Sequence, residues 1–142
     1  NEEDHNAGDV KDDIPFQPDR DQQEKVFKAF VKRYPNIKCI ARHVRFAHSC
    51  SENSLSAYLW LNGETYESKR LTFHILDRVG GGDSFGGGLI YACLNDYDPQ
   101  STIEFAVAAS CLKHTVSGEF NLVTVDEVMK LAFSASGNEV SR

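Results

Sequence analysis

The spacing of apolar residues changes along the chain, from a helical period near its start to strict alternation in the middle and helical spacing again towards its end. The first periodic stretch predicts a helix with an apolar face made of Val26, Phe27, Phe30, Val31 and Tyr34. Asn62-Gly63 separates two short runs and predicts a tight β-hairpin. The whole pattern predicts a helix at 21–34, strands at 37–41, 56–61, 64–68 and 71–76, an aperiodic stretch at 42–54, and helices at 84–94, 101–113 and from 124 onwards.

Two of these helices carry a recognisable start, a Ser or Thr followed three residues later by Glu. The starts are at Ser101 and Thr124, and the last helix is expected to bury Val125, Val128, Met129 and Leu131. Residues 9–20 are typical of an acidic loop, and residues 135–142 of a frayed tail. Strands interleaved with helices predict one domain of α/β architecture over residues 1–142.

Negative charge is concentrated at the start of the chain. The net charge is −6 over 142 residues, but residues 1–24 alone carry −7, so the remainder is close to neutral. No basic stripe suits a nucleic acid, and no apolar run approaches the roughly 18 residues that span a membrane. We therefore expect neither a nucleic acid nor a membrane as partner.

The four cysteines form no CxxC pair and no regular disulfide framework. Cys93 and Cys111 lie among apolar residues of predicted helices and are interpreted as buried thiols. Because no signal peptide opens the chain, a reducing, cytoplasmic compartment is expected.

Three consecutive glycines stand between the predicted strand at 71–76 and the helix that follows. Without Cβ atoms, the backbone N–H groups of Gly80, Gly81 and Gly82 can turn towards one point, next to the positive end of the helix dipole. This arrangement predicts an anion site. Asp83 would repel an anion unless it has its own task, and removal of a proton from an attacking hydroxyl is such a task. A purely structural turn capped by Asp explains the same residues, and both interpretations stay open at this point.

Two familiar phosphate-binding motifs do not fit this loop. The pattern GxGxxG fails because Phe85 and Tyr91 occupy the positions of its last glycine. The pattern GxxxxGK[ST] fails because no lysine follows a suitably spaced glycine. Neither a dinucleotide-binding fold nor a P-loop is therefore predicted.

The segment 77–88 resembles the signature D-T-x-G-A-G-D, followed by S/A-F-x-x-G, of ribokinase-type (PfkB) carbohydrate kinases. The matching residues are Asp77, Gly80, Gly82, Asp83, Phe85 and Gly88, whereas Arg78 replaces Thr and Gly81 replaces Ala. The flanking residues, with 105–110 and 113–123, are similar to 2-keto-3-deoxygluconate kinases. The resemblance covers 71–132 closely and most of the remainder weakly. It implies a ribokinase-like three-layer α/β/α fold, of which the chain holds the carboxy-terminal portion only.

The resemblance also implies a reaction. Asp83 would take the proton from the primary hydroxyl of a sugar, which then attacks the γ-phosphate of ATP, while the N–H groups of Gly80, Gly81 and Gly82 form the anion hole. The opening residues resemble the N-x-x-E element of the family, in which Asn1 would contact the nucleotide and Asp4 would bind Mg²⁺ through water. An acidic helix start explains these two residues equally well.

Further contacts are expected around the nucleotide and the sugar. The resemblance places adenine against residues 106–111, with Val107 and Cys111 among its contacts. It also places Glu119 near the sugar, where related kinases often carry Asp.

The stretch 42–54 offers two arginines and a set of metal-binding residue types. Arg42 and Arg45 are candidates for contacts with phosphate groups. His43, His48 and Cys50 are one ligand short of a structural zinc site and loosely spaced, so a polar loop on the nucleotide side explains them better.

The family resemblance implies an amino-terminal half, with most sugar contacts and a lid, that the chain does not contain. We therefore expect sites for ATP and a small sugar acid but poor turnover by the chain alone, and an exposed sheet edge that favours a homo-oligomer. Two hypotheses stay open. In the first, the chain is the catalytic half of a 2-keto-3-deoxygluconate kinase, or of a kinase for another sugar such as fructose or ribose. In the second, it is a non-catalytic nucleotide-binding module.

Overall fold

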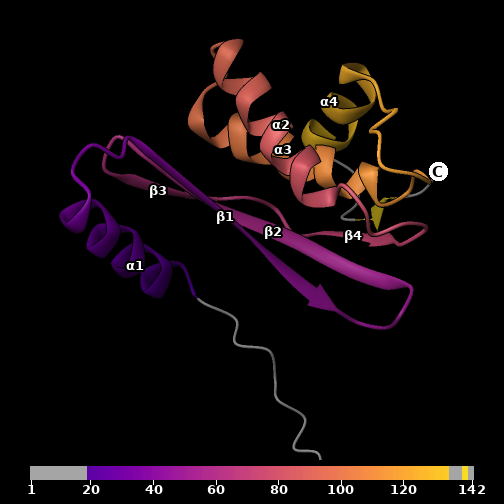
Figure 1. Ribbon diagram of the computed structural model, residues 1–142, viewed down its shortest axis with the longest axis horizontal. Helices are drawn as coiled ribbons and strands as arrows, with labels where there is room; N and C mark the ends of the chain where they lie inside the picture. The colour runs from indigo at the N-terminus through magenta and orange to yellow at the C-terminus, as the bar shows by residue number, and fades with distance from the viewer. Residues whose placement is uncertain (1–18, 135–138, 141–142) are drawn as a thin grey trace, which may run out of the picture.

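A sheet of five strands carries one helix on one face and three helices on the other (Figure 1). A computed structural model describes residues 19–134 and 139–140, and the arrangement is that of these residues. The elements are α1 (Arg20–Arg33), β1 (Cys39–Ala47), β2 (Glu52–Leu61), β3 (Glu64–Glu67), β4 (Leu71–His74), α2 (Gly81–Leu94), α3 (Pro99–Lys113), α4 (Val125–Phe133) and β5 (Glu139–Val140). The predicted α/β/α layering is confirmed.

The strand order is β1-β2-β4-β5, with β3 paired to β2 as well. β1, β3 and β4 all run antiparallel to β2, and β5 runs parallel to β4. The predicted hairpin is confirmed, because Asn62 and Gly63 connect β2 to β3 with positive φ angles of 51° and 89°. β5 falls within the predicted tail 135–142, which is therefore wrong for Glu139–Val140.

The central strand β2 divides its side chains between two cores by simple alternation. Leu55, Ala57 and Leu59 point into the larger core, which β4 and the three helices α2, α3 and α4 complete. Tyr58 and Trp60 point to the opposite face and join the core beneath α1. Every side chain from Asn53 to Trp60 is consequently buried, so β2 is enclosed on both sides.

α1 begins one residue earlier than predicted, after Asp19, whose side chain accepts a hydrogen bond from the Gln22 N–H at 2.7 Å. Arg20 is thus helical and not part of the predicted loop. Of the predicted apolar face only Phe27 is fully buried, at 2% exposure, while Val26, Phe30 and Tyr34 remain about half exposed. The face is correctly located but covers only a narrow strip of the sheet.

The stretch 42–54, interpreted as aperiodic, contains most of β1 at 42–47 and the start of β2 at 52–54. Val44 and Phe46 point towards α1 and are buried, while His43 and Arg45 point to the other face. Buried and exposed side chains do alternate along this strand, but the alternation is short. The positions that face away from α1 are occupied by the large polar side chains of His43 and Arg45. This is why the sequence pattern predicted a strand only at 37–41, of which residues 39–41 belong to β1.

The two helix starts predicted from capping signatures have different outcomes. The capping box of Thr124 and Glu127 is confirmed at the start of α4. The one predicted at Ser101 is wrong, because α3 begins at Pro99 and Asp98 caps it by accepting from the Ser101 N–H at 3.0 Å.

Burial differs from the prediction at three further side chains. Within α4, Val128 is buried, but Val125 and Met129 are more than one third exposed. Cys111 is buried as predicted, whereas Cys93 is exposed. Across the part of the chain that the structure describes, we find no helix long and apolar enough to cross a membrane.

Candidate active site

Asp77 joins the loop before α2 to the loop after α3. Its Oδ1 accepts a hydrogen bond from the Val79 N–H at 3.0 Å, and its Oδ2 accepts one from the Gly118 N–H at 2.8 Å. These backbone donors, with Val79 contributing most, lower the pKa of the Asp77 carboxyl. The ionised carboxylate therefore holds two segments together that are far apart in the sequence.

The anion loop, residues 80–83, turns at Gly80, whose φ of 79° favours glycine. A Cβ at Gly80 would lie 2.8 Å from the carbonyl oxygen of Glu119 and 3.2 Å from Lys113 Cε, so the space allows no larger residue. Gly80 is the N-cap of α2, and no side chain caps this helix end. The N–H groups of the first turn of α2 are thus left for another acceptor, as an anion site requires.

Asp83 lies in the first turn of α2 with its side chain exposed. Together with Gly80 and Glu119 it lines a cavity of about 380 Å³. Candidates predicted from two separate parts of the sequence, the loop 80–83 and Glu119, therefore line the same cavity beside a helix N-terminus.

The rest of this cavity is mainly apolar. Tyr91 and Phe105 stack on each other at one wall, with ring centroids 5.3 Å apart and planes at 18°. The other apolar residues that line it are Ala109, Phe120, Val123, Val125 and Val128. A cavity with a charged end at the anion loop and an apolar remainder suits a ligand that combines a phosphate with a flat ring.

Comparisons with solved structures agree with this geometry. The chain is similar to 2-dehydro-3-deoxygluconokinase from Thermotoga maritima, with 41% sequence identity and a TM-score of 0.77 over 80% of this chain and 34% of that one. It is also similar to a PfkB family carbohydrate kinase from Listeria grayi, with 34% identity and a TM-score of 0.72 over 75% of this chain and 33% of that one.

The chain is thus similar in sequence and fold to part of the PfkB carbohydrate kinases, as the resemblance at 77–88 implied. It spans about one third of the length of the two solved kinases. No family model and no curated protein matches it. The predicted ribokinase-like fold is confirmed for the portion that the structure describes.

Two further residues of the PfkB signature serve the packing of the site. Phe85 is buried with its ring 5.2 Å from that of His43, which attaches α2 to β1. A Cβ at Gly88 would lie 3.1 Å from the Cα of Ala106, so this glycine allows α2 and α3 to approach closely. Both residues hold α2, and with it Asp83, in place, and Gly88 also lines the cavity.

The structure contradicts two of the predicted nucleotide contacts. Val107 and Cys111 have no exposed surface and point into the core between α3 and the sheet. Burial also raises the pKa of the Cys111 thiol. Within the predicted adenine segment it is Ala109 that lines the cavity, on another side of the same helix.

The two arginines of β1 lie on opposite faces of the sheet because they are three residues apart on a strand. Arg42 points towards α1, where its Nη1 donates to Gln23 Oε1 at 2.8 Å. The sheet separates it from the anion loop, so the predicted phosphate contact is wrong for Arg42. Arg45 points towards the loop, with its Nη2 3.1 Å from His114 Nε2.

Asp4 was predicted to bind Mg²⁺ through water, and Asn1 to contact the nucleotide. Asn1 and Asp4 lie outside the described residues. Within residues 19–134 and 139–140, no group of three or more His, Cys, Asp or Glu side chains could hold a metal ion. His48 instead contacts Ser54 Oγ at 2.6 Å. Mg²⁺ usually keeps several waters and binds substrate phosphates with one or two carboxylates, and Asp83 and Glu119 are the carboxylates that line this cavity.

Sequence reasoning missed the role of His114. The side chain is fully buried beneath Gly81, and burial lowers the pKa of its imidazole. The wall residues Tyr91 and Phe105 were missed as well. A signal existed for His114, since a polar pair, Lys113-His114, ends an otherwise apolar helix.

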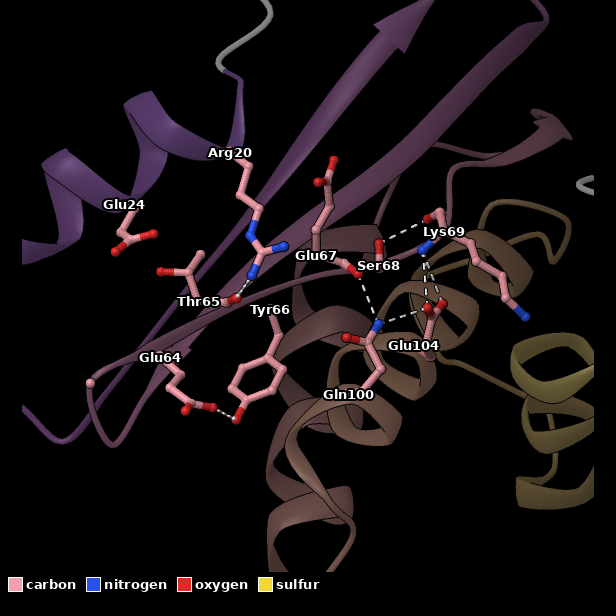
Figure 2. Close-up of a pocket in the computed structure, with 11 residues that line it drawn as sticks. Arg20, Glu24, Glu64, Thr65, Tyr66, Glu67, Ser68, Lys69, Gln100 and Glu104 are labelled. Carbon is pink, nitrogen blue, oxygen red and sulfur yellow. Dashed lines mark hydrogen bonds between the residues drawn. The ribbon is translucent and has the colours of Figure 1, made fainter.

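A larger cavity of about 750 Å³ lies between α1, β3 and α3 (Figure 2). Arg20 reaches from α1 to the carbonyl oxygen of Thr65 at 2.8 Å, and Gln100 donates to the carbonyl oxygen of Glu67 at 2.8 Å. Glu104 accepts from the Lys69 N–H at 3.1 Å. These polar groups are already hydrogen-bonded within the protein. Four carboxylates also line the cavity, and their negative charge disfavours the binding of phosphate. The cavity beside Asp83 is therefore the better nucleotide site.

Proposed function

We propose that this chain provides the nucleotide-binding and proton-accepting part of a kinase that transfers phosphate from ATP to the primary hydroxyl of a sugar acid. The acceptor that we propose is 2-keto-3-deoxygluconate, which would become its 6-phosphate. The similarity to the Thermotoga maritima 2-dehydro-3-deoxygluconokinase supports this choice of acceptor. Because the chain spans about one third of that kinase, we expect little turnover from the chain alone.

In the proposed reaction Asp83 takes the proton of the sugar hydroxyl as its oxygen bonds to the γ-phosphorus of ATP. The bond between that phosphorus and the bridging oxygen breaks, and ADP leaves. The free N–H groups at the start of α2 stabilise the negative charge of the transferred phosphoryl group. Mg²⁺, when bound to the phosphates, neutralises part of their charge.

The remaining cavity residues give the nucleotide its orientation. With its phosphates at the anion loop, a nucleotide would direct its ring towards the apolar walls formed by Ala109, Val123 and Val128. Glu119 lies at the same end as Asp83 and would accept hydrogen bonds from sugar hydroxyls.

The observation that carries the proposal is the position of Asp83, an exposed carboxylate in the first turn of an uncapped helix and at the edge of an apolar cavity. A general base contributes about 10²–10⁴-fold to a rate. The test is a chimera in which residues 19–134 replace the aligned segment of the Thermotoga maritima kinase. ATP-dependent phosphorylation of 2-keto-3-deoxygluconate is then measured for the chimera with and without Asp83→Asn.

We expect the Asp83→Asn chimera to lose about 10²–10⁴-fold in kcat while KM for ATP changes little. Asp96→Asn is the matched control, because Asp96 is exposed just after the other end of α2 and does not line the cavity. An Asp83→Asn chimera as active as this control would refute the assignment. A chimera that binds ATP but transfers no phosphate would favour a nucleotide-binding module without catalysis.

A further inference from the structure

His114 lies directly beneath the anion loop. Its side chain is fully buried, and its ring fills the space that a side chain at Gly81 would need. A Cβ at Gly81 would lie 2.7 Å from His114 Nε2 and 3.1 Å from Nδ1, and closer still to Cε1. On its other side the ring packs against Phe73, with centroids 4.8 Å apart. The imidazole is therefore a wedge between the sheet and the first turn of α2.

Both ring nitrogens have partners that determine the protonation state. Nδ1 lies 2.7 Å from the carbonyl oxygen of Ser110, which can only accept a hydrogen bond, so Nδ1 carries the proton. Nε2 lies 3.1 Å from Arg45 Nη2, which can only donate, so Nε2 is bare. The two contacts together require a neutral imidazole in one tautomer.

The last turn of α3 also holds both ends of the segment that leads into α2. The Ser110 hydroxyl donates to the carbonyl oxygen of Gly81 at 2.8 Å. The backbone carbonyl of His114 accepts hydrogen bonds from the N–H groups of Leu76 and Asp77, at 2.8 and 3.1 Å. Ser110 thus connects to the end of the segment 76–81, and His114 to its start.

We propose that His114 is a positioning residue of the anion loop, whose neutral imidazole keeps the N–H groups of residues 80–83 directed at a bound phosphate and whose protonation releases them. The proposal rests on the proposed function in one respect, that this loop binds phosphate. His114 touches no part of the proposed substrate and acts through Gly81.

The charges around the ring explain why protonation would release the loop. Burial is the main cause that lowers the pKa of His114, and Arg45 from β1, Lys113 from α3 and Arg78 from the preceding loop lower it further. A proton on Nε2 would remove the acceptor of Arg45 and place a cation among these three. The stabilisation by neutral His114 is complete above the ordinary histidine pKa of about 6.5 and is lost as the pH falls from there through the lowered pKa of the folded chain.

The test uses the whole 142-residue chain and inorganic sulfate, which does not titrate between pH 5 and 7.5, so no change in the probe itself enters the result. Sulfate affinity is read from the backbone amide shifts of residues 80–83 by NMR. Simple electrostatics predicts tighter sulfate binding at low pH, because carboxylates and exposed histidines gain protons. The positioning role predicts the opposite, a loss of at least about tenfold in affinity from pH 7.5 to 5 (about 1.4 kcal/mol).

Two variants and one measurement without ligand complete the test. His114→Gln cannot be protonated, so its sulfate affinity should not fall with pH, whereas His74→Gln, at an exposed histidine of β4, should behave like the parent chain. Without sulfate, the exchange of the hydrogen-bonded amides next to the loop, those of Leu76, Asp77 and Ser84, is followed instead and corrected for intrinsic rates. It should accelerate at least tenfold as the pH falls in the parent chain but not in His114→Gln.

The outcomes separate the two proposals. If sulfate and ATP shift none of these amides at any pH, the proposed function fails, and the exchange measurement alone decides the role of His114. If the corrected exchange in the parent chain is independent of pH, or if His114→Gln shows the same acid response as the parent, the positioning role is overturned.

Discussion

The most specific structural prediction concerns Gly81→Ala. The added methyl group would lie within 3.1 Å of three atoms of the His114 ring, and that ring is held by Ser110 on one side and Arg45 on the other. Since neither contact leaves the ring free to move, the methyl group overpacks a buried site, which typically costs about 1–3 kcal/mol. Gly86→Ala is the matched control, because a Cβ there meets nothing within 4 Å in the same helix. The control should stabilise the chain by about 0.5–1 kcal/mol through helix propensity.

The assay is urea unfolding, followed by circular dichroism and by the fluorescence of Trp60, the only tryptophan of the chain. Trp60 is 9% exposed in the core beneath α1, so its signal reports on the far face of the sheet. We expect Gly81→Ala to lie about 1.5–4 kcal/mol below Gly86→Ala in free energy of unfolding, the sum of the two effects. A double variant with His114→Ala should recover part of the loss that Gly81→Ala adds, since the two residues are in contact. Equal stability of Gly81→Ala and Gly86→Ala would refute the close packing of the His114 ring against Gly81.

Three further predictions follow from the fold. Leu59→Ala, at a position with no exposed surface, should cost about 2–5 kcal/mol in urea unfolding, whereas Leu94→Ala, 77% exposed, should stay within about 0.5 kcal/mol. Thr124→Ala removes the side-chain acceptor of the α4 capping box and should cost about 1 kcal/mol in the same assay; an unchanged midpoint would contradict that cap. A thiol reagent should modify Cys39, Cys50 and Cys93 in the native chain and Cys111 only after denaturation, because Cys111 is buried; rapid native labelling of Cys111 would contradict the packing of α3.

The order of the elements and the central hairpin could be predicted from the sequence because both depend on local signals. Asn62-Gly63 favours one turn type, and Thr124 with Glu127 forms its cap within a single helical turn. The turn into α2 was also predictable, since Gly80 has a positive φ of 79° that other residues rarely adopt.

What the sequence could not reveal depends on long-range contacts. Only residues 39–41 of β1 fell within the predicted strand. The remainder was missed because His43 and Arg45, which are common in loops, lie on a strand where they contact Phe85 and His114 from distant segments. α3 is buried on almost every side, so no amphipathic pattern distinguished Val107 in the core from Ala109 at the cavity. The charge state of His114 likewise follows from enclosure, which no local pattern encodes.

The central claim, that the start of α2 binds the phosphates of a nucleotide, is tested most directly by titrating the chain with ATP and mapping the backbone amide shifts. We predict that the largest shifts occur at residues 80–83 and along the cavity that Asp83 lines. Gly82→Ala should weaken ATP binding at least about tenfold without loss of stability, because its methyl group meets no protein atom but obstructs the approach of a phosphate, whereas Gly86→Ala should bind as the parent does. Shifts centred on the cavity between α1 and β3, or equal affinity of Gly82→Ala and Gly86→Ala for ATP, would contradict the claim.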